Sequence, residues 1–191
     1  MTTQERVYSA DDLWNRSHEQ GSTDRRFELV KGAIIEVSPA GGEHGDIASE
    51  FNLLVRLHVK QYRLGYVTAA ETGYILFTDP VEGDTVRAPD VGFVAAERLP
   101  NGLPKSYIPV PPDLAIEVVS PNDKAGDIER KIEDYLRAGI PLFVFVYADT
   151  RTFMVYTRSQ VFRLTENDTF DAGDVLPGFR ITVRDVFPAS R

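Results

Sequence analysis

The sequence predicts an α/β protein in which helices flank a mixed β-sheet. Two segments, at about residues 43–64 and 123–138, carry apolar residues at helical spacing. Short apolar runs bounded by glycine, proline and aspartate lie before, between and after them, and such runs are typical of strands. Because strands and helices alternate in groups along the chain, a sheet covered by helices is the expected architecture.

Local signals place the elements along the chain. Ser9 is a good N-cap for a short helix, Gly32 suits a hairpin turn, and Gly139 and Pro141 stop the second long helix. The elements expected, in order, are a helix at 9–14, a loop at 21–24, a hairpin at 27–37, a helix at about 43–64, strands at 67–68, 73–77, 86–94 and 114–119, a helix at about 123–138, strands at 142–147, 152–157 and 160–164, and a packed tail containing 174–179 and 183–187.

The composition is that of one globular domain. The chain has 191 residues, of which 42% are hydrophobic and 26% charged. We expect a single domain over 1–191, with a helix and hairpin decoration at 1–40, a core at 41–165 and a C-terminal tail at 166–191 packed on the core. The proline-rich segment 99–112 is expected to be a long surface loop, and such loops are often functional.

Charge and cysteine content exclude several classes of protein. The net charge of -8 argues against a broad electrostatic surface for DNA, although a local basic rim remains compatible with it. Cysteine is absent, so there is no disulfide framework and no thiolate metal site. No apolar run is long enough to span a membrane, and the first residues lack the apolar stretch of a secretory signal, so we expect a cytoplasmic protein.

Glu117 stands out because it interrupts an otherwise apolar strand, 114–119. Such a strand is covered on both faces, and alternation places Glu117 on the same face as Ala115 and Val119. An unpaired carboxylate there would be costly, so Glu117 needs a cation, a metal or an opening to a cleft. A buried ion pair with an arginine or lysine is the structural alternative.

Asp90 is the second acid. Pro89 holds its neighbours extended, and Asp90 opens the next apolar stretch. Two acids on adjacent strands would repel each other unless a cation lies between them. Mg²⁺, for which Mn²⁺ can substitute, prefers one or two carboxylates together with water and phosphate oxygens. The pair therefore suggests a site for metal-assisted phosphodiester hydrolysis.

Other polar side chains are candidates for the border of this site. Lys124 and Lys131 lie along one edge of the apolar face of the second long helix, and either could reach the sheet, although solvated helix lysines are common. His44 shares a helix face with core residues, and Glu50 lies at the edge of that face. Glu28 in the hairpin is a spare acid that fits a solvated strand position equally well.

The chain resembles the Uma-two family, a branch of the PD-(D/E)XK superfamily found in bacteria. The Uma-two family itself is named for its similarity to restriction endonucleases. The resemblance covers nearly everything from Tyr8 to Phe187. It rests on Phe27-Glu28-Leu29-Val30-Lys31-Gly32, Ser38-Pro39 followed by His44, Arg87-Ala88-Pro89-Asp90-Val91, the stretch from Pro111 to Pro121, Glu129 to Tyr135 with Ala138-Gly139, and Asp174 to Phe179.

This resemblance implies a restriction-endonuclease-like fold, frequent homodimers, and Asp90 and Glu117 as the metal acids. The usual lysine two residues after the glutamate is absent, because Val119 holds that position. The resemblance implies that the lysine has moved to Lys131, and that Glu28 and His44 border the site.

The chain departs from the family pattern in two places. Ala33 ends a turn that usually reads Asp-Gly-Glu, so one customary acid is missing. Val144 and Tyr147 stand where tryptophan and aspartate are usual, which we interpret as variation within the core.

Three hypotheses follow. The first is a Mg²⁺-dependent endonuclease acting on DNA, with the Val118 carbonyl as a third metal ligand and Lys131 stabilising the phosphate or positioning water. The second is a catalytically silent binding or regulatory protein of the same fold, which the acidic net charge and the altered hairpin turn favour. The third is a homodimer with a small-molecule or tRNA-like substrate, in which loop 99–112 forms part of the interface.

Overall fold

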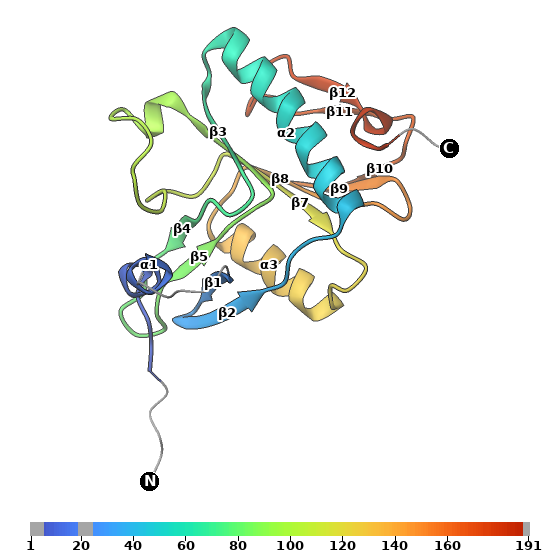
Figure 1. The fold of residues 1–191 in the computed structure, drawn as a ribbon. Coiled ribbons are helices and arrows are strands. Elements are labelled where there is room, and N and C mark those ends of the chain that lie inside the picture. Colours follow the sequence, from blue (N-terminus) through green and yellow to red (C-terminus); the bar gives the residue numbers. More distant parts are fainter. Residues whose placement is uncertain (1–5, 19–24, 189–191) are drawn as a thin grey trace.

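The computed structural model describes residues 6–18 and 25–188, and the loop predicted at 21–24 lies outside them. Helices and strands follow one another along the chain (Figure 1). They are α1 (Ala10–His18), β1 (Arg26–Val30), β2 (Ala33–Val37), α2 (Gly42–Tyr62), β3 (Gly65–Ala69), β4 (Tyr74–Phe77), β5 (Thr85–Arg87), β6 (Val91–Ala95), the 3₁₀-helix η1 (Ala96–Arg98), β7 (Leu114–Val119), α3 (Ala125–Arg137), β8 (Leu142–Tyr147), β9 (Thr152–Thr157), β10 (Val161–Leu164), β11 (Thr169–Asp171), β12 (Arg180–Thr182) and the 3₁₀-helix η2 (Val183–Val186).

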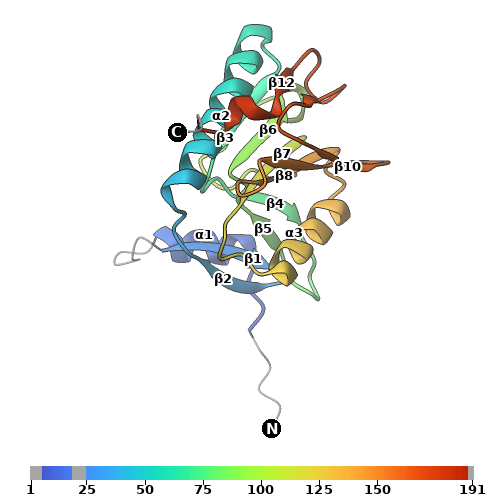
Figure 2. The same ribbon diagram turned by 90° about the vertical axis from the view of Figure 1, so that its right-hand side faces the viewer.

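A six-stranded sheet in the order β10-β9-β8-β7-β6-β3 forms the centre of the fold. Strands β7 and β8 run parallel, whereas the other neighbours are antiparallel. Helix α2 and the β11–β12 hairpin cover one face, and α3 lies on the other (Figures 1 and 2). The predicted fold class, a mixed sheet flanked by helices, is confirmed.

Alternating side chains of the central strands supply a core on each face. Ile116 of β7 packs on the α2 side with Phe51 and Phe153, while Ala115 packs on the α3 side with Tyr135. Strand residues alternate between faces, so a strand covered on both sides is apolar at nearly every position. This explains why the segment 114–119 is apolar except for Glu117.

A second sheet, in the order β2-β1-β5-β4, lies next to α1 (Figure 1). Its strand β5 ends at Arg87, and β6 of the central sheet begins at Val91. The single strand predicted at 86–94 is therefore wrong, because the chain passes from one sheet to the other between these residues. Pro89 has no N–H with which to continue a ladder, so the break falls there.

The ends of the chain also differ from the prediction. Helix α1 extends to His18, beyond the predicted end at residue 14. Ser9 caps it as expected, because its Oγ accepts a hydrogen bond from the Asp12 N–H at 3.1 Å. The tail contains a hairpin of β11 and β12 that was not predicted, and the side chains of Leu176 and Val183 are fully buried against the α2 face.

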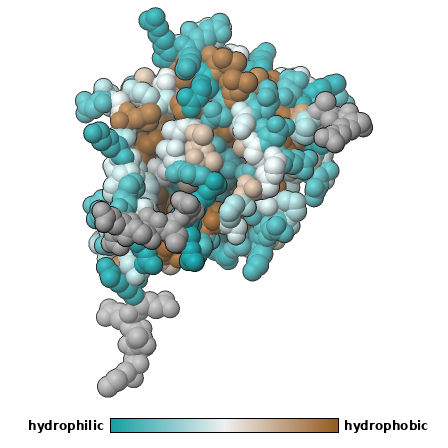
Figure 3. Space-filling model, in the orientation of Figure 1, coloured by the Kyte–Doolittle hydropathy of each residue, from teal (hydrophilic) through white to brown (hydrophobic). Residues whose placement is uncertain are grey.

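The loop at 99–112 is anchored in part. Ile108 is buried and forms a parallel bridge with Tyr74 at the edge of β4. Elsewhere on the surface, Leu53 and Leu57 are exposed on α2, where Figure 3 shows an apolar patch over the middle of the helix. Within residues 6–18 and 25–188, no helix combines the length and apolar character needed to cross a membrane.

Candidate functional site

Asp90 and Glu117 lie where the pairing of β6 with β7 ends. The last pair of the antiparallel register is Val91 with Ile116, so continuing the register by one residue brings Asp90 opposite Glu117. Beyond this point the Val118 N–H has no β6 partner, and it donates to Asp90 Oδ2 at 2.8 Å. Because the strand is interrupted at Pro89, Asp90 lies outside β6, and its side chain accepts a hydrogen bond from the backbone of β7.

Glu117 is only 6% exposed and has partners on both carboxylate oxygens. Lys131 Nζ lies 2.9 Å from Oε2, and the Tyr135 hydroxyl donates to Oε1. Burial raises the pKa of Glu117 to about 7, and the negative charges of Asp90 and Glu28 add to the rise, although Lys131 and Tyr135 act in the opposite direction. The strand register and the hydrogen bond from the Val118 N–H to Asp90 place the two acids next to each other.

Lys131 contacts a second acid, Glu28 of β1, whose Oε1 lies 3.9 Å from Nζ. Burial alone would lower the pKa of Lys131, but Glu117 and Glu28 outweigh burial and raise it. Burial likewise would raise the pKa of Glu28, but Lys131 and Arg87 lower it. Glu28 is therefore held as a carboxylate, and Lys131 is held as a cation.

Arg87, the last residue of β5, joins the site to α3. Its Nη1 donates to Glu28 Oε2 at 2.7 Å, and its Nε donates to Asp134 Oδ2 at 2.9 Å. Arg87, Glu28 and Asp134 are each buried, and the Ala88 N–H donates to Glu28 Oε1 at 3.1 Å. A buried guanidinium between two carboxylates fixes the relative positions of β1, β5 and α3.

His44, in the first turn of α2, completes the group. Its Nε2 lies 3.2 Å from Asp90 Oδ2. This hydrogen bond to Asp90 raises the pKa of His44; burial opposes the rise, while the charges of Asp90, Glu117 and Asp123 add to it. The imidazole thus belongs to the site and is not a core histidine.

The structure brings most of the predicted site residues together. Asp90, Glu117, Lys131, Glu28 and His44 form one connected cluster. Two others lie outside it. Lys124 is exposed at the N-cap of α3, and the side chain of Glu50 in α2 forms no hydrogen bond or ion pair with any residue that the structure describes.

Three residues of the cluster were missed as site residues. Arg87 follows two buried strand residues, and a charge in that position needs a partner, which could have drawn attention to it. Tyr135 lies four residues after Lys131, so the two share a helix face. Asp134 gave no comparable signal, because the residues around it are those of an ordinary charged helix.

The donor set suits a hard divalent cation. Among the described residues, no group of three or more histidine, cysteine, aspartate or glutamate side chains is arranged to hold a metal ion alone. Mg²⁺ commonly needs only one or two carboxylates and completes its shell with carbonyl oxygen and water. The N–H and C=O of one strand residue point to the same edge of the strand, so the Val118 carbonyl lies on the edge from which its N–H reaches Asp90.

Comparison with known proteins identifies the relatives of this fold. A family model, Uma2, described as "Putative restriction endonuclease", matches residues 14–184. The chain belongs to the Uma2 family. The resemblance seen in the sequence motifs is thereby confirmed.

A solved structure and the curated proteins complete this comparison. A structure from Anabaena variabilis ATCC 29413, described as "a putative nuclease belonging to DUF820", is similar with a TM-score of 0.77 and 21% identity. The match covers 94% of this chain and 97% of that one, which supports the assignment of the fold. None of the curated proteins matches this Uma2 chain.

Proposed function

We propose that this Uma2 protein is a Mg²⁺-dependent endonuclease of the PD-(D/E)XK type, with DNA as its substrate and Mn²⁺ able to replace Mg²⁺. The observation that carries the proposal is the meeting of Asp90, Glu117 and Lys131 at one point between two strands and a helix. Membership of a family described as restriction endonucleases supports a nuclease.

Asp90, Glu117 and the Val118 carbonyl would hold the metal. A bound divalent cation supplies charge for the phosphate and lowers the pKa of a water molecule. Different residues orient the two carboxylates. Asp90 is oriented by the Val118 N–H and by His44, while Glu117 is oriented by Lys131 and Tyr135.

Lys131 serves this reaction as a cation. Its raised pKa keeps the ammonium protonated at neutral pH, so it is unsuited to act as a general base. A protonated lysine beside the metal acids stabilises the charge that develops on a phosphate and orients the attacking water. We assign this role to Lys131 and not to Lys124, which is exposed at the start of α3.

Cleavage of supercoiled plasmid DNA tests the proposal. The wild-type protein is expected to nick or linearise the plasmid with Mg²⁺ or Mn²⁺, and to be inactive in EDTA. The double variant Asp90→Ala/Glu117→Ala is expected to lose both cleavage and metal binding. The matched control is Glu97→Ala/Asp149→Ala, which removes two exposed acids elsewhere. Cleavage by the first double variant at the wild-type rate would refute the proposal.

A second function has an observation in its favour. Both oxygens of Glu117 already have partners, so the Lys131 ion pair satisfies the buried carboxylate without a metal. Together with the net charge of -8, this favours a catalytically silent binding or regulatory protein of the same fold. Titration calorimetry separates the two: DNA binding with no binding of Mg²⁺ or Mn²⁺ would support the silent protein.

The homodimer implied by the family resemblance is also a proposal. Sedimentation velocity over a range of protein concentrations tests it directly. A single species at the mass of one 21.4 kDa chain throughout that range would contradict the dimer.

A further inference from the structure

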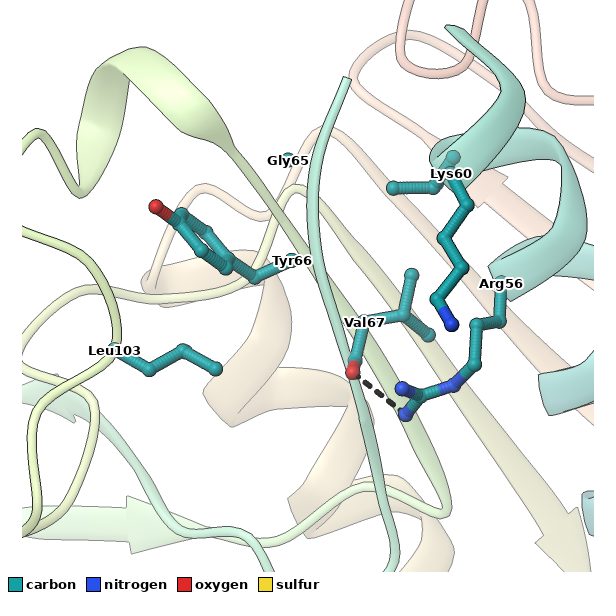
Figure 4. Close-up of a pocket in the computed structure, with 7 residues that line it drawn as sticks. Arg56, Lys60, Gly65, Tyr66, Val67 and Leu103 are labelled. Atoms are coloured by element: carbon teal, nitrogen blue, oxygen red, sulfur yellow. Dashed lines mark hydrogen bonds between the residues drawn. The ribbon is translucent and has the colours of Figure 1, made fainter. Parts of the chain in front are cut away.

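A second basic site lies at the β3 edge of the central sheet, apart from the acidic cluster. A cavity of about 190 Å³ opens there between the C-terminal half of α2, strand β3 and the loop after η1 (Figure 4). It is lined by Arg56, Val59, Lys60, Gly65, Tyr66, Val67 and Leu103. Two of these side chains are cations and none is an acid.

Arg56 is held in a defined orientation at this cavity. Its Nη2 donates to the Val67 carbonyl at 2.9 Å, and its Nε donates to Asn52 Oδ1 at 3.2 Å. Both partners are neutral. Within the described part of the chain, neither Arg56 nor Lys60 forms an ion pair with a carboxylate. A protein with a net charge of -8 thus leaves an oriented arginine without a counter-ion.

The two cations converge on one stretch of β3. Figure 4 shows the Lys60 ammonium and the Arg56 guanidinium pointing toward the same part of the strand, next to Val67. Like charges brought together repel each other unless an anion lies between them. The flank of α2 that faces β3 carries no acid to relieve this repulsion, since Gly45, Ser49 and Asn52 precede the two cations along it.

We infer that the cavity binds a phosphate group of a nucleic-acid strand that also reaches the Asp90–Glu117 cluster. Arginine beside lysine is well suited to a phosphate, and the Tyr66 ring on the other side of β3 offers a surface for a base or sugar. This inference rests on the proposed function, because it takes the substrate to be a nucleic acid.

The geometry of α2 sets the distance between the two sites. Arg56 and Lys60 follow His44 by three to four helical turns, which is about 18 to 24 Å along the axis at the usual rise per residue. At about 3.4 Å per nucleotide, a duplex would cover that distance in roughly five to seven base pairs. The cavity would thus contact the backbone about half a helical turn from the bond that is cut.

Binding of a short labelled DNA duplex, measured by fluorescence anisotropy in EDTA at several salt concentrations, tests this. The double variant Arg56→Gln/Lys60→Gln is expected to bind on the order of tenfold more weakly at low salt. The slope of log affinity against log salt should fall by about 0.9, because one phosphate contact is lost. Lys60→Gln alone changes an exposed side chain that forms no ion pair with any residue that the structure describes, so it should fold normally and weaken binding less than the double variant does.

The matched control is Arg158→Gln/Arg163→Gln. It removes the same charge from the β9–β10 hairpin, at the opposite edge of the central sheet. Its affinity and salt slope should remain those of the wild type. Equal weakening by both double variants would show a general charge effect and overturn the inference, as would wild-type binding by Arg56→Gln/Lys60→Gln.

Further outcomes distinguish this inference from binding of a small phosphate ligand and from the proposed nuclease activity. If inorganic phosphate or a mononucleotide shifts the Arg56 Nε–Hε resonance but the duplex does not bind, the nucleic-acid assignment is overturned. If the wild type binds the duplex through Arg56 and Lys60 but cleaves nothing with any metal, the inference stands and the proposed nuclease activity fails. If the wild type cleaves DNA but Arg56→Gln/Lys60→Gln binds the duplex as tightly as the wild type does, the inference fails and the proposed nuclease activity stands.

Discussion

The Lys131 ammonium lies 2.9 Å from Glu117 Oε2, although the two residues belong to a helix and a strand. The position two residues after Glu117, where the family pattern usually has a lysine, holds Val119, which packs among the apolar residues of the α3 face. Helix α3 crosses that face and places Lys131 next to the Glu117 carboxylate. The cation is therefore supplied by packing of the helix on the sheet.

Replacing Lys131 tests its role in the reaction. Lys131→Met keeps most of the apolar stem but removes the charge beside Glu117, so we expect DNA cleavage to fall by roughly 100- to 1,000-fold. Lys124→Met is the control on the same helix, and it should cleave at the wild-type rate. The measurement is the initial rate of plasmid nicking. Similar losses in both variants would contradict the assignment of Lys131.

The protonation of Glu117 should be visible in the neutral pH range. Burial is the largest cause of a pKa of about 7, compared with 4.5 for an ordinary glutamate. An NMR titration of ¹³C-labelled glutamate side chains should show one midpoint near pH 7, absent in Glu117→Gln. Mg²⁺ should move this midpoint to lower pH, because a nearby cation favours the carboxylate. A midpoint that saturating Mg²⁺ leaves unchanged would contradict a metal at Glu117.

The same shift has a consequence for stability. The folded pKa of Glu117 lies above the unfolded one, so its stabilising contribution is complete below about pH 4.5 and is lost as the pH rises toward 7. We expect the free energy of unfolding of the wild type, relative to Glu117→Gln, to fall by on the order of 3 kcal/mol across this window. Urea denaturation at several pH values measures it, and a difference that rises with pH would show the opposite shift.

Arg87 should be among the most sensitive positions for stability. Arg87→Met leaves Glu28 and Asp134 buried without their common partner, which should lower the free energy of unfolding by about 3–5 kcal/mol. Urea denaturation provides the measurement. Arg130→Met is the control, because Arg130 pairs with Asp127 on the exposed face of α3 and its loss should change little. Equal effects from the two variants would show that the buried contacts of Arg87 are unimportant.

Tyr135 orients Glu117 from the same helix as Lys131. Tyr135→Phe removes only the hydroxyl that donates to Glu117 Oε1, so the free energy of unfolding should fall by about 1–3 kcal/mol. Mg²⁺ affinity, measured by calorimetry, should also fall, because the carboxylate loses one of its two fixed contacts. Tyr62→Phe, at an exposed position on α2, should change neither quantity. If Tyr135→Phe keeps the wild-type stability and Mg²⁺ affinity, Tyr135 does not orient Glu117.

Much of the secondary structure could be predicted because its causes are local. The helical spacing of apolar residues located α2 and α3, and glycine and proline marked their limits. The strand at 86–94 was placed correctly as an apolar segment, but its division was not seen. Pro89 has a local effect on the backbone, whereas the assignment of the two halves to different sheets depends on which strands they meet.

The sequence by itself determined that Glu117 is buried in a strand and requires a partner, since an isolated carboxylate among apolar residues is costly wherever the chain leads. Only the tertiary structure decided what that partner is. Lys131 reaches Glu117 and Lys124 does not, because α3 lies across the sheet at one particular rotation. Arg87 meets Glu28 and Asp134 for the same reason. These contacts join residues far apart in the chain, and their distances depend on how whole elements pack, which no local spacing encodes.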